Sequence, residues 1–163
     1  MHLSAVRRIL LVVAFVSLAA LPASAQTYTL TANLSGASEV PIIGTGAFGT
    51  ATVVVDLGAR TVNYRVDVFN LPSGVTVSHI HVGPPGFAGP VVINFAPPVT
   101  ASNDFAYSGT VRDTEFALQP NLGIRSADDM FQAIIGGNTY VNVHSQVNGG
   151  GEIRGQLTLS TNR

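Results

Sequence analysis

The chain has 163 residues, of which 46% are apolar and 10% are charged, and its formal net charge is −1. This composition excludes an intrinsically disordered chain, and the absence of cysteine excludes a disulfide framework, a thiolate metal site and a cysteine nucleophile. All 8 basic residues are arginine, and a near-neutral chain without lysine lacks the clustered cations that nucleic-acid binding needs.

The first 25 residues have the three features of a secretory signal peptide. Arg7 and Arg8 form a positive segment, Ile9 to Leu21 form a short apolar segment, and Ala23-Ser24-Ala25 is a small-residue cleavage site. We therefore expect cleavage before Gln26 and a secreted or periplasmic product. The apolar segment is too short to remain as a membrane span, so the mature chain should have none.

The rest of the chain, residues 26–163, reads as one domain of short strands separated by turns. Alternating or β-branched segments predict strands at Tyr28–Leu34, Thr50–Leu57, Val62–Val68, Val75–Val82, Val91–Phe95, Phe105–Val111, Tyr140–His144 and Ile153–Leu159. Asp56 to Ala59 predicts a hairpin turn. Ser126 to Ile135 is the one helical candidate, with Ser126 and Asp129 placed as a capping box. The expected fold is a single all-β, Greek-key-like antiparallel sandwich of about eight strands with one short helix.

The histidines of the mature chain point to a metal site. His79 and His81 are two residues apart on a predicted strand, so their side chains share one face with Cα atoms roughly 6.5 Å apart. Two imidazoles at that spacing can converge on one ion with bonds of about 2 Å. If the strand that ends at His144 lies nearby, His144 supplies a third ligand. A ligand set of histidines without thiolates favours copper, zinc or nickel over the hard cations.

A structural role for the same histidines is the alternative. A histidine on a strand is often a partly buried polar residue with a satisfied hydrogen bond. In that case the protein is an extracellular adhesion or protein-interaction module, and its partner binds equally well when His79, His81 and His144 are replaced.

Two further sets of residues have side chains capable of chemistry. Glu152 and Arg154 are two residues apart on the last predicted strand, and we expect Arg154 to form a buried ion pair with Glu152 or Glu39 that fixes this strand. The functional alternative is that Arg154 attracts an anion towards the metal. Ser145 follows His144, but the chain has no G-x-S-x-G nucleophile elbow, so we predict no catalytic residue and a binding protein rather than an enzyme.

Several motifs together resemble the chordin-type domain, called CHRD. In chain order they are Leu34-Ser-Gly-Ala-Ser-Glu-Val-Pro41, Ser78-His-Ile-His-Val-Gly83, Gly89-Pro-Val-Val92, Tyr140-Val-Asn-Val-His-Ser145 and Gly151-Glu-Ile-Arg-Gly-Gln-Leu157. This resemblance implies an extracytoplasmic β-domain over 26–163, found alone in bacterial secreted proteins and repeated in animal chordin. It implies no settled biochemical activity.

A fainter resemblance is to copper/zinc superoxide dismutase. Gly49 to Val82 is similar to its early strands and H-x-H motif, and Val141-Asn-Val-His144 is similar to its later copper-ligand strand. The resemblance implies copper ligation by His79, His81 and His144. The bridging histidine, the zinc-loop ligands and the disulfide of that family have no counterpart here, so zinc is less expected and any dismutase activity would be weak.

Overall fold

The computed structural model describes residues 26–100 and 102–160. The expected signal peptide at residues 1–25 lies outside the described residues. Within the described part, no helix has both the length and the apolar character that a membrane crossing requires.

The described residues form nine strands, one α-helix and three short 3-10 helices. The strands are β1 (Thr27–Ser35), β2 (Phe48–Asp56), β3 (Thr61–Phe69), β4 (Val75–Val82), β5 (Val91–Asn94), β6 (Phe105–Arg112), β7 (Thr139–Ser145), β8 (Ile153–Gln156) and β9 (Thr158–Leu159). The helix is α1 (Ala127–Ile135), and the 3-10 helices are Gly36–Ser38, Asp113–Glu115 and Pro120–Leu122.

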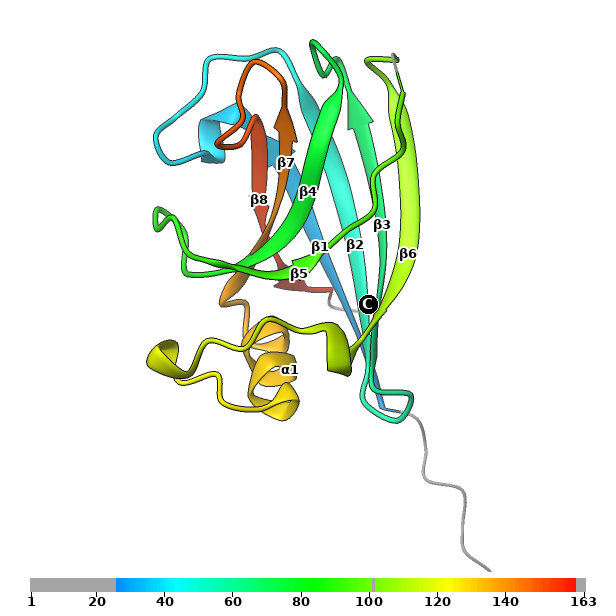
Figure 1. Cartoon of the computed structure of the whole chain (residues 1–163), viewed down its shortest axis with the longest axis vertical. Coiled ribbons are helices and arrows are strands. Elements are labelled where there is room, and N and C mark those ends of the chain that lie inside the picture. The colour runs from blue at the N-terminus through cyan, green and yellow to red at the C-terminus, as the bar shows by residue number, and fades with distance from the viewer. Residues whose placement is uncertain (1–25, 101, 161–163) are drawn as a thin grey trace, which may run out of the picture.

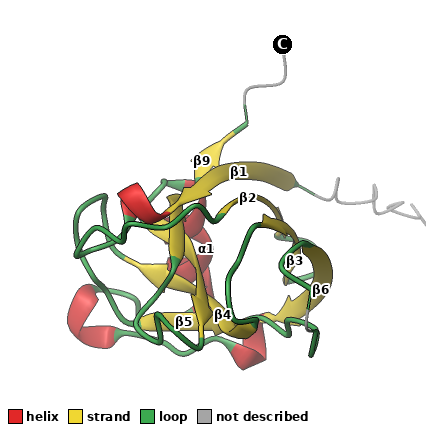
Figure 2. Ribbon diagram, turned by 90° about the horizontal axis from the view of Figure 1, so that it is seen from above, coloured by secondary structure: helices red, strands yellow, loops and turns green. Residues whose placement is uncertain are grey.

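The strands form one continuous antiparallel sheet that curls over a single core (Figures 1 and 2). Its order is β5-β4-β7-β8-β1-β2-β3-β6, with β9 added beside β1. The chain crosses between the half of the sheet that holds β1, β2, β3 and β6 and the half that holds β4, β5, β7 and β8 at three connections: β3 to β4, β5 to β6 and β6 to β7. The ends of the sheet approach each other, because the Ala96 N–H that follows β5 donates to the Tyr64 hydroxyl of β3 at 3.0 Å. The predicted all-β sandwich with one helix is confirmed.

The core follows from side-chain alternation along the strands. On β3, Val62, Tyr64, Val66 and Val68 are all buried, as their spacing of two residues predicts. Burial of such side chains is the main favourable term in folding. The helix α1 closes one end of the core with Met130, Phe131 and Ile134.

The predicted helix cap is also confirmed. The Asp129 N–H donates to the Ser126 hydroxyl at 3.1 Å, and the Asp129 carboxylate accepts from the Ser126 N–H at 3.0 Å. This reciprocal capping box satisfies donors at the start of α1 that have no partner within the helix.

The last predicted strand, by contrast, is divided. The backbone N–H of Leu157 donates to the Thr139 carbonyl, which separates β8 from β9. Leu157 is fully buried, so the interruption keeps this side chain in the core while β9 continues along β1.

Strand β7 positions the candidate site because it is buried on both faces. Every residue from Thr139 to Ser145 is buried. Its inner face carries Val141 and Val143, while its outer face carries polar side chains. Loops at 36–47, 83–90 and 146–151 lie beside this outer face, so polar groups there are removed from water and need internal partners.

Candidate metal centre

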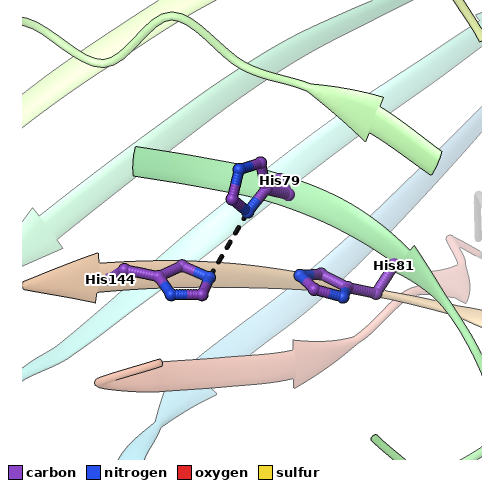
Figure 3. A group of neighbouring side chains, drawn as sticks. All are labelled: His79, His81 and His144. Carbon is purple, nitrogen blue, oxygen red and sulfur yellow. Dashed lines mark hydrogen bonds between the residues drawn. The ribbon is translucent and has the colours of Figure 1, made fainter. Parts of the chain in front are cut away.

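The three histidines come together on the outer face of β4 and β7. In the antiparallel register His79 is opposite Asn142 and His81 is opposite Tyr140, so His144, two residues after Asn142, lies diagonally from His79. Figure 3 shows the three rings converging from the two strands. One ring nitrogen from each residue lies within 4.8 Å of the other two.

Backbone carbonyls fix the tautomers of two of these rings. The Nδ1–H of His81 donates to the Gly89 carbonyl oxygen at 2.9 Å, and the Nδ1–H of His144 donates to the Gly149 carbonyl oxygen at 2.9 Å. A carbonyl oxygen only accepts, so each Nδ1 carries the proton and each Nε2 keeps a free lone pair. Metal-binding histidines are generally oriented by such a hydrogen bond from the second nitrogen.

The free nitrogens are left in an arrangement that suits a metal. The Nε2 of His81 is buried and has no hydrogen-bond partner among the described residues. The Nε2 of His144 has no proton, so in the metal-free protein the Nδ1–H of His79 donates to it at 3.3 Å (Figure 3). A metal that displaces the proton from Nδ1 of His79 would therefore find one donor set: Nδ1 of His79 and Nε2 of both His81 and His144.

Burial favours the neutral form of the His79 and His81 rings, which is the form that binds metals. Burial, together with the nearby His144 and His81 rings, lowers the pKa of His79 to about 4. Burial also lowers the pKa of His81, against the opposing effect of its hydrogen bond to Gly89. Within the described residues the group of potential ligands contains no carboxylate, so the donor set is all nitrogen.

One comparison with known proteins identifies the family of this chain. The family model of the CHRD domain matches residues 30–157. The chain belongs to the CHRD-domain family. CHRD domains are typically extracellular or periplasmic. Neither the curated proteins nor the solved structures gave a match, so the resemblance to copper/zinc superoxide dismutase has no support from them.

An aromatic and cationic stack supports His81 in this CHRD domain. The Tyr140 ring stacks on the His81 ring with centroids 4.9 Å apart and planes 9° apart. The Arg154 guanidinium carbon lies 3.3 Å from the centre of the Tyr140 ring. The Tyr140 hydroxyl also accepts from the Gly89 N–H at 3.0 Å, so it fixes the residue whose carbonyl orients His81.

The expected ion pair of Arg154 is wrong. Arg154 donates to the backbone carbonyls of Phe87 at 2.9 Å and Pro84 at 3.2 Å. Within the described residues it forms no salt bridge with Glu152 or Glu39. The 83–90 loop reaches over β8 and supplies the acceptors instead, so Arg154 fixes the loop that holds His81.

Glu152 fixes the second loop of the centre. Its buried carboxylate accepts from the hydroxyls of Ser145 and Thr45, each at 2.5 Å, and from the Asn148 side-chain amide at 2.8 Å. Burial raises the pKa of Glu152, but these hydrogen bonds outweigh it and the net shift is downward. Glu152 thereby holds the 146–151 loop, which carries the Gly149 carbonyl. The Ser145 hydroxyl therefore donates to a structural carboxylate in this network.

The supporting residues were missed by the sequence interpretation, which placed no role on Gly89, Gly149 or Tyr140. Tyr140 had one usable signal, because it shares a strand face with His144. The two glycines had no usable signal apart from their tendency to form turns. Every residue has a backbone carbonyl, so the sequence does not indicate which carbonyls orient a histidine.

Proposed function

We propose that this CHRD domain is an extracytoplasmic copper-binding protein with His79, His81 and His144 as its ligands. One observation carries the proposal. Three ring nitrogens lie within 4.8 Å of one another, and that of His81 is buried without a hydrogen-bond partner. A buried polar atom without a partner is costly. A metal ion at this point gives the His81 nitrogen a partner.

The donor set favours copper. Three neutral imidazoles suit copper, zinc or nickel, and Cu²⁺ has the highest affinity in the divalent series. A hard cation such as Ca²⁺ or Mg²⁺ prefers oxygen ligands. The set also lacks the thiolates of most structural zinc sites. Zinc is therefore the second candidate.

Binding or carrying the metal is the activity that the site supports best. His79 is only partly buried, whereas His81 and His144 are buried, so His79 lies on the side from which an ion enters. Three protein ligands leave a coordination position for an exogenous ligand or for transfer to a second protein.

The decisive experiment is metal content. The mature protein is exported, purified gently and analysed by elemental mass spectrometry. We expect about one copper per chain, lost in the His79→Ala/His81→Ala double variant and kept in Ser108→Ala, an exposed change on β6. No bound metal after loading with Cu²⁺ and Zn²⁺ would contradict the proposal. The histidines would then be structural, and the adhesion or interaction role would stand.

Export is a separate part of the proposal. Residues 1–25 direct secretion and are removed, so N-terminal sequencing of the exported protein should begin at Gln26. An exported protein that retains residues 1–25 would overturn this part alone and leave the metal proposal unaffected.

A further inference from the structure

A pocket separate from the histidines lies beside β8, between the 36–47 and 83–90 loops. In Figure 1 these are the cyan segment with the 3-10 helix and the green hook on the left. The pocket encloses about 470 Å³. Apolar side chains of Val40, Pro41, Ile42 and Pro85 line it, together with Glu39 and Arg154. Its volume lies within the range of small-molecule sites.

Glu39 is a buried acid without a matching cation. It is 6% exposed, its Oε1 has no hydrogen-bond partner among the described residues, and its Oε2 accepts a long 3.4 Å contact from the Asn142 amide. The Val40 backbone N–H also favours the charged carboxylate. Burial raises the pKa of Glu39 to about 7, although the charge of Arg154 lowers it. A buried carboxyl group so poorly satisfied is expensive to keep.

Arg154 is a buried cation without a matching anion. It is 3% exposed, and within the described residues no carboxylate lies within 4.0 Å of it. Its hydrogen bonds to Pro84 and Phe87 go to neutral carbonyls. A guanidinium has five N–H donors, so these contacts leave others available to an anion.

We propose that this pocket binds a free α-amino acid with an apolar side chain. Its ammonium group pairs with Glu39, its carboxylate pairs with Arg154, and its side chain packs on the apolar rim. The Gln156 side-chain Oε1, another buried acceptor without a partner among the described residues, lines the same pocket and offers the ammonium group a second acceptor.

The two unpaired charges select a zwitterion over simpler ligands. A monocation would satisfy Glu39 and face the positive Arg154, while a monoanion would do the reverse. Only a ligand with both charges matches both groups, and an unmatched buried charge reduces affinity. The rim adds apolar burial, to which Ile42 contributes most because it is 73% exposed in the free protein.

The test uses L-leucine as the probe. Chemical shifts of the mature protein are followed by ¹H–¹⁵N NMR during titration with L-leucine, with 4-methylpentanoate, which lacks the ammonium group, and with 3-methylbutylamine, which lacks the carboxylate. We expect saturable binding of leucine with a Kd of about 1 mM or tighter, with the largest shifts at the backbone amides of residues 37–40, 42 and 86. Each analogue should bind at least about tenfold more weakly.

Variants connect this binding to the named residues. Glu39→Gln should weaken leucine binding about tenfold or more, and Glu115→Gln, an exposed carboxyl outside the pocket, should leave it unchanged. Ile42→Ser changes an exposed side chain, so it should fold normally and weaken leucine more than glycine. If Glu39→Gln does not fold, Ile42→Ser and the two analogues decide the question.

Two outcomes would overturn the inference. One is the absence of saturable shifts with leucine. The other is equal binding of leucine and its two analogues, which would show an apolar surface without charge recognition. The site does not use the His79 ring, and His79→Ala leaves the stack of His81, Tyr140 and Arg154 in place, so this variant should bind leucine as the parent does. Loss of copper binding and loss of leucine binding are therefore separate results.

Discussion

The Nδ1 of His79 and the Nε2 of His144 lie 3.3 Å apart, although 65 positions separate the residues in the chain. Two nitrogens bound to one ion at about 2.0–2.1 Å, with a near-tetrahedral angle between them, are separated by about 3.3 Å. The free protein therefore already holds this pair at a metal-binding separation. Preorganisation of this kind reduces the cost of binding.

The two glycines whose carbonyls orient the histidines give a matched pair of variants. A Cβ on Gly89 would lie 1.6 Å from the Val82 carbonyl oxygen, whereas a Cβ on Gly149 would meet nothing within 4 Å. We expect Gly89→Ala to lower the free energy of unfolding by about 3 kcal/mol or more and to abolish copper binding, and Gly149→Ala to change stability by less than about 0.5 kcal/mol. Denaturant unfolding and copper content measure both. Equal behaviour of the two variants would show that the 83–90 loop is not packed as described.

His79 makes the metal-free protein sensitive to acid. Its pKa is about 4 in the folded protein against 6.5 for a free histidine side chain, so between these pH values the unfolded chain binds more protons. The stability contributed by the neutral ring is present above pH 6.5 and is lost as pH falls towards about 4. His79→Gln should remove this part of the pH dependence. Denaturation midpoints of both proteins at pH 7 and pH 4.5 test it, and identical pH dependences would contradict it.

The fold was predictable from local patterns. Alternation in β3 and β4 needs only neighbouring residues, and the capping box of Ser126 and Asp129 spans three positions. The break at Leu157 was not predictable, because it depends on a backbone bond to Thr139 on another strand.

The site was predictable in part for the same reason. Two residues on one strand share a face by geometry, so His79 and His81 could be paired from the sequence alone. The place of His144 depends on the pairing of β4 with β7. The sequence does not show which strands pair, so His144 could be predicted as a ligand only if its strand lay beside that of His79. The partners of Arg154 were predicted wrongly, since charge pairing suggested Glu39 or Glu152 and could not foresee carbonyls from the 83–90 loop.

Glu39 should make the protein less stable at alkaline pH. Burial is the main cause that raises its pKa from 4.5 to about 7, and the charge of Glu152 acts in the same direction. The charge of Arg154 and the hydrogen bonds from the Val40 backbone and the Asn142 amide oppose this rise. The folded state then binds the extra proton, so this stability is present below pH 4.5 and is lost as pH rises through about 7. The rise corresponds to roughly 3 kcal/mol at most.

The variant that tests this is Glu39→Gln, which removes the ionisable group and keeps its shape. Relative to the parent, we expect it to be more stable at pH 8 by about 1–3 kcal/mol and nearly unchanged at pH 4.5. Urea unfolding at both pH values, without ligand or metal, provides the comparison. Destabilisation at pH 8 would mean that the Glu39 carboxylate has a partner that compensates its burial.

Two substitutions of Tyr140 distinguish the contribution of its ring stacking from that of its hydroxyl hydrogen bond. Tyr140→Phe keeps the ring between His81 and Arg154 but removes the hydroxyl that accepts from the Gly89 N–H at 3.0 Å. It should cost about 1–2 kcal/mol of unfolding free energy and weaken copper binding by up to about tenfold, because the Gly89 carbonyl is held less firmly. Tyr140→Ala also removes the stack and should cost about 3–5 kcal/mol. Calorimetric unfolding and a competition titration with a copper chelator measure the two quantities. If Tyr140→Phe binds copper as tightly as the parent, the orientation of His81 depends on the stack and its own hydrogen bond to Gly89, and the hydroxyl serves only the loop.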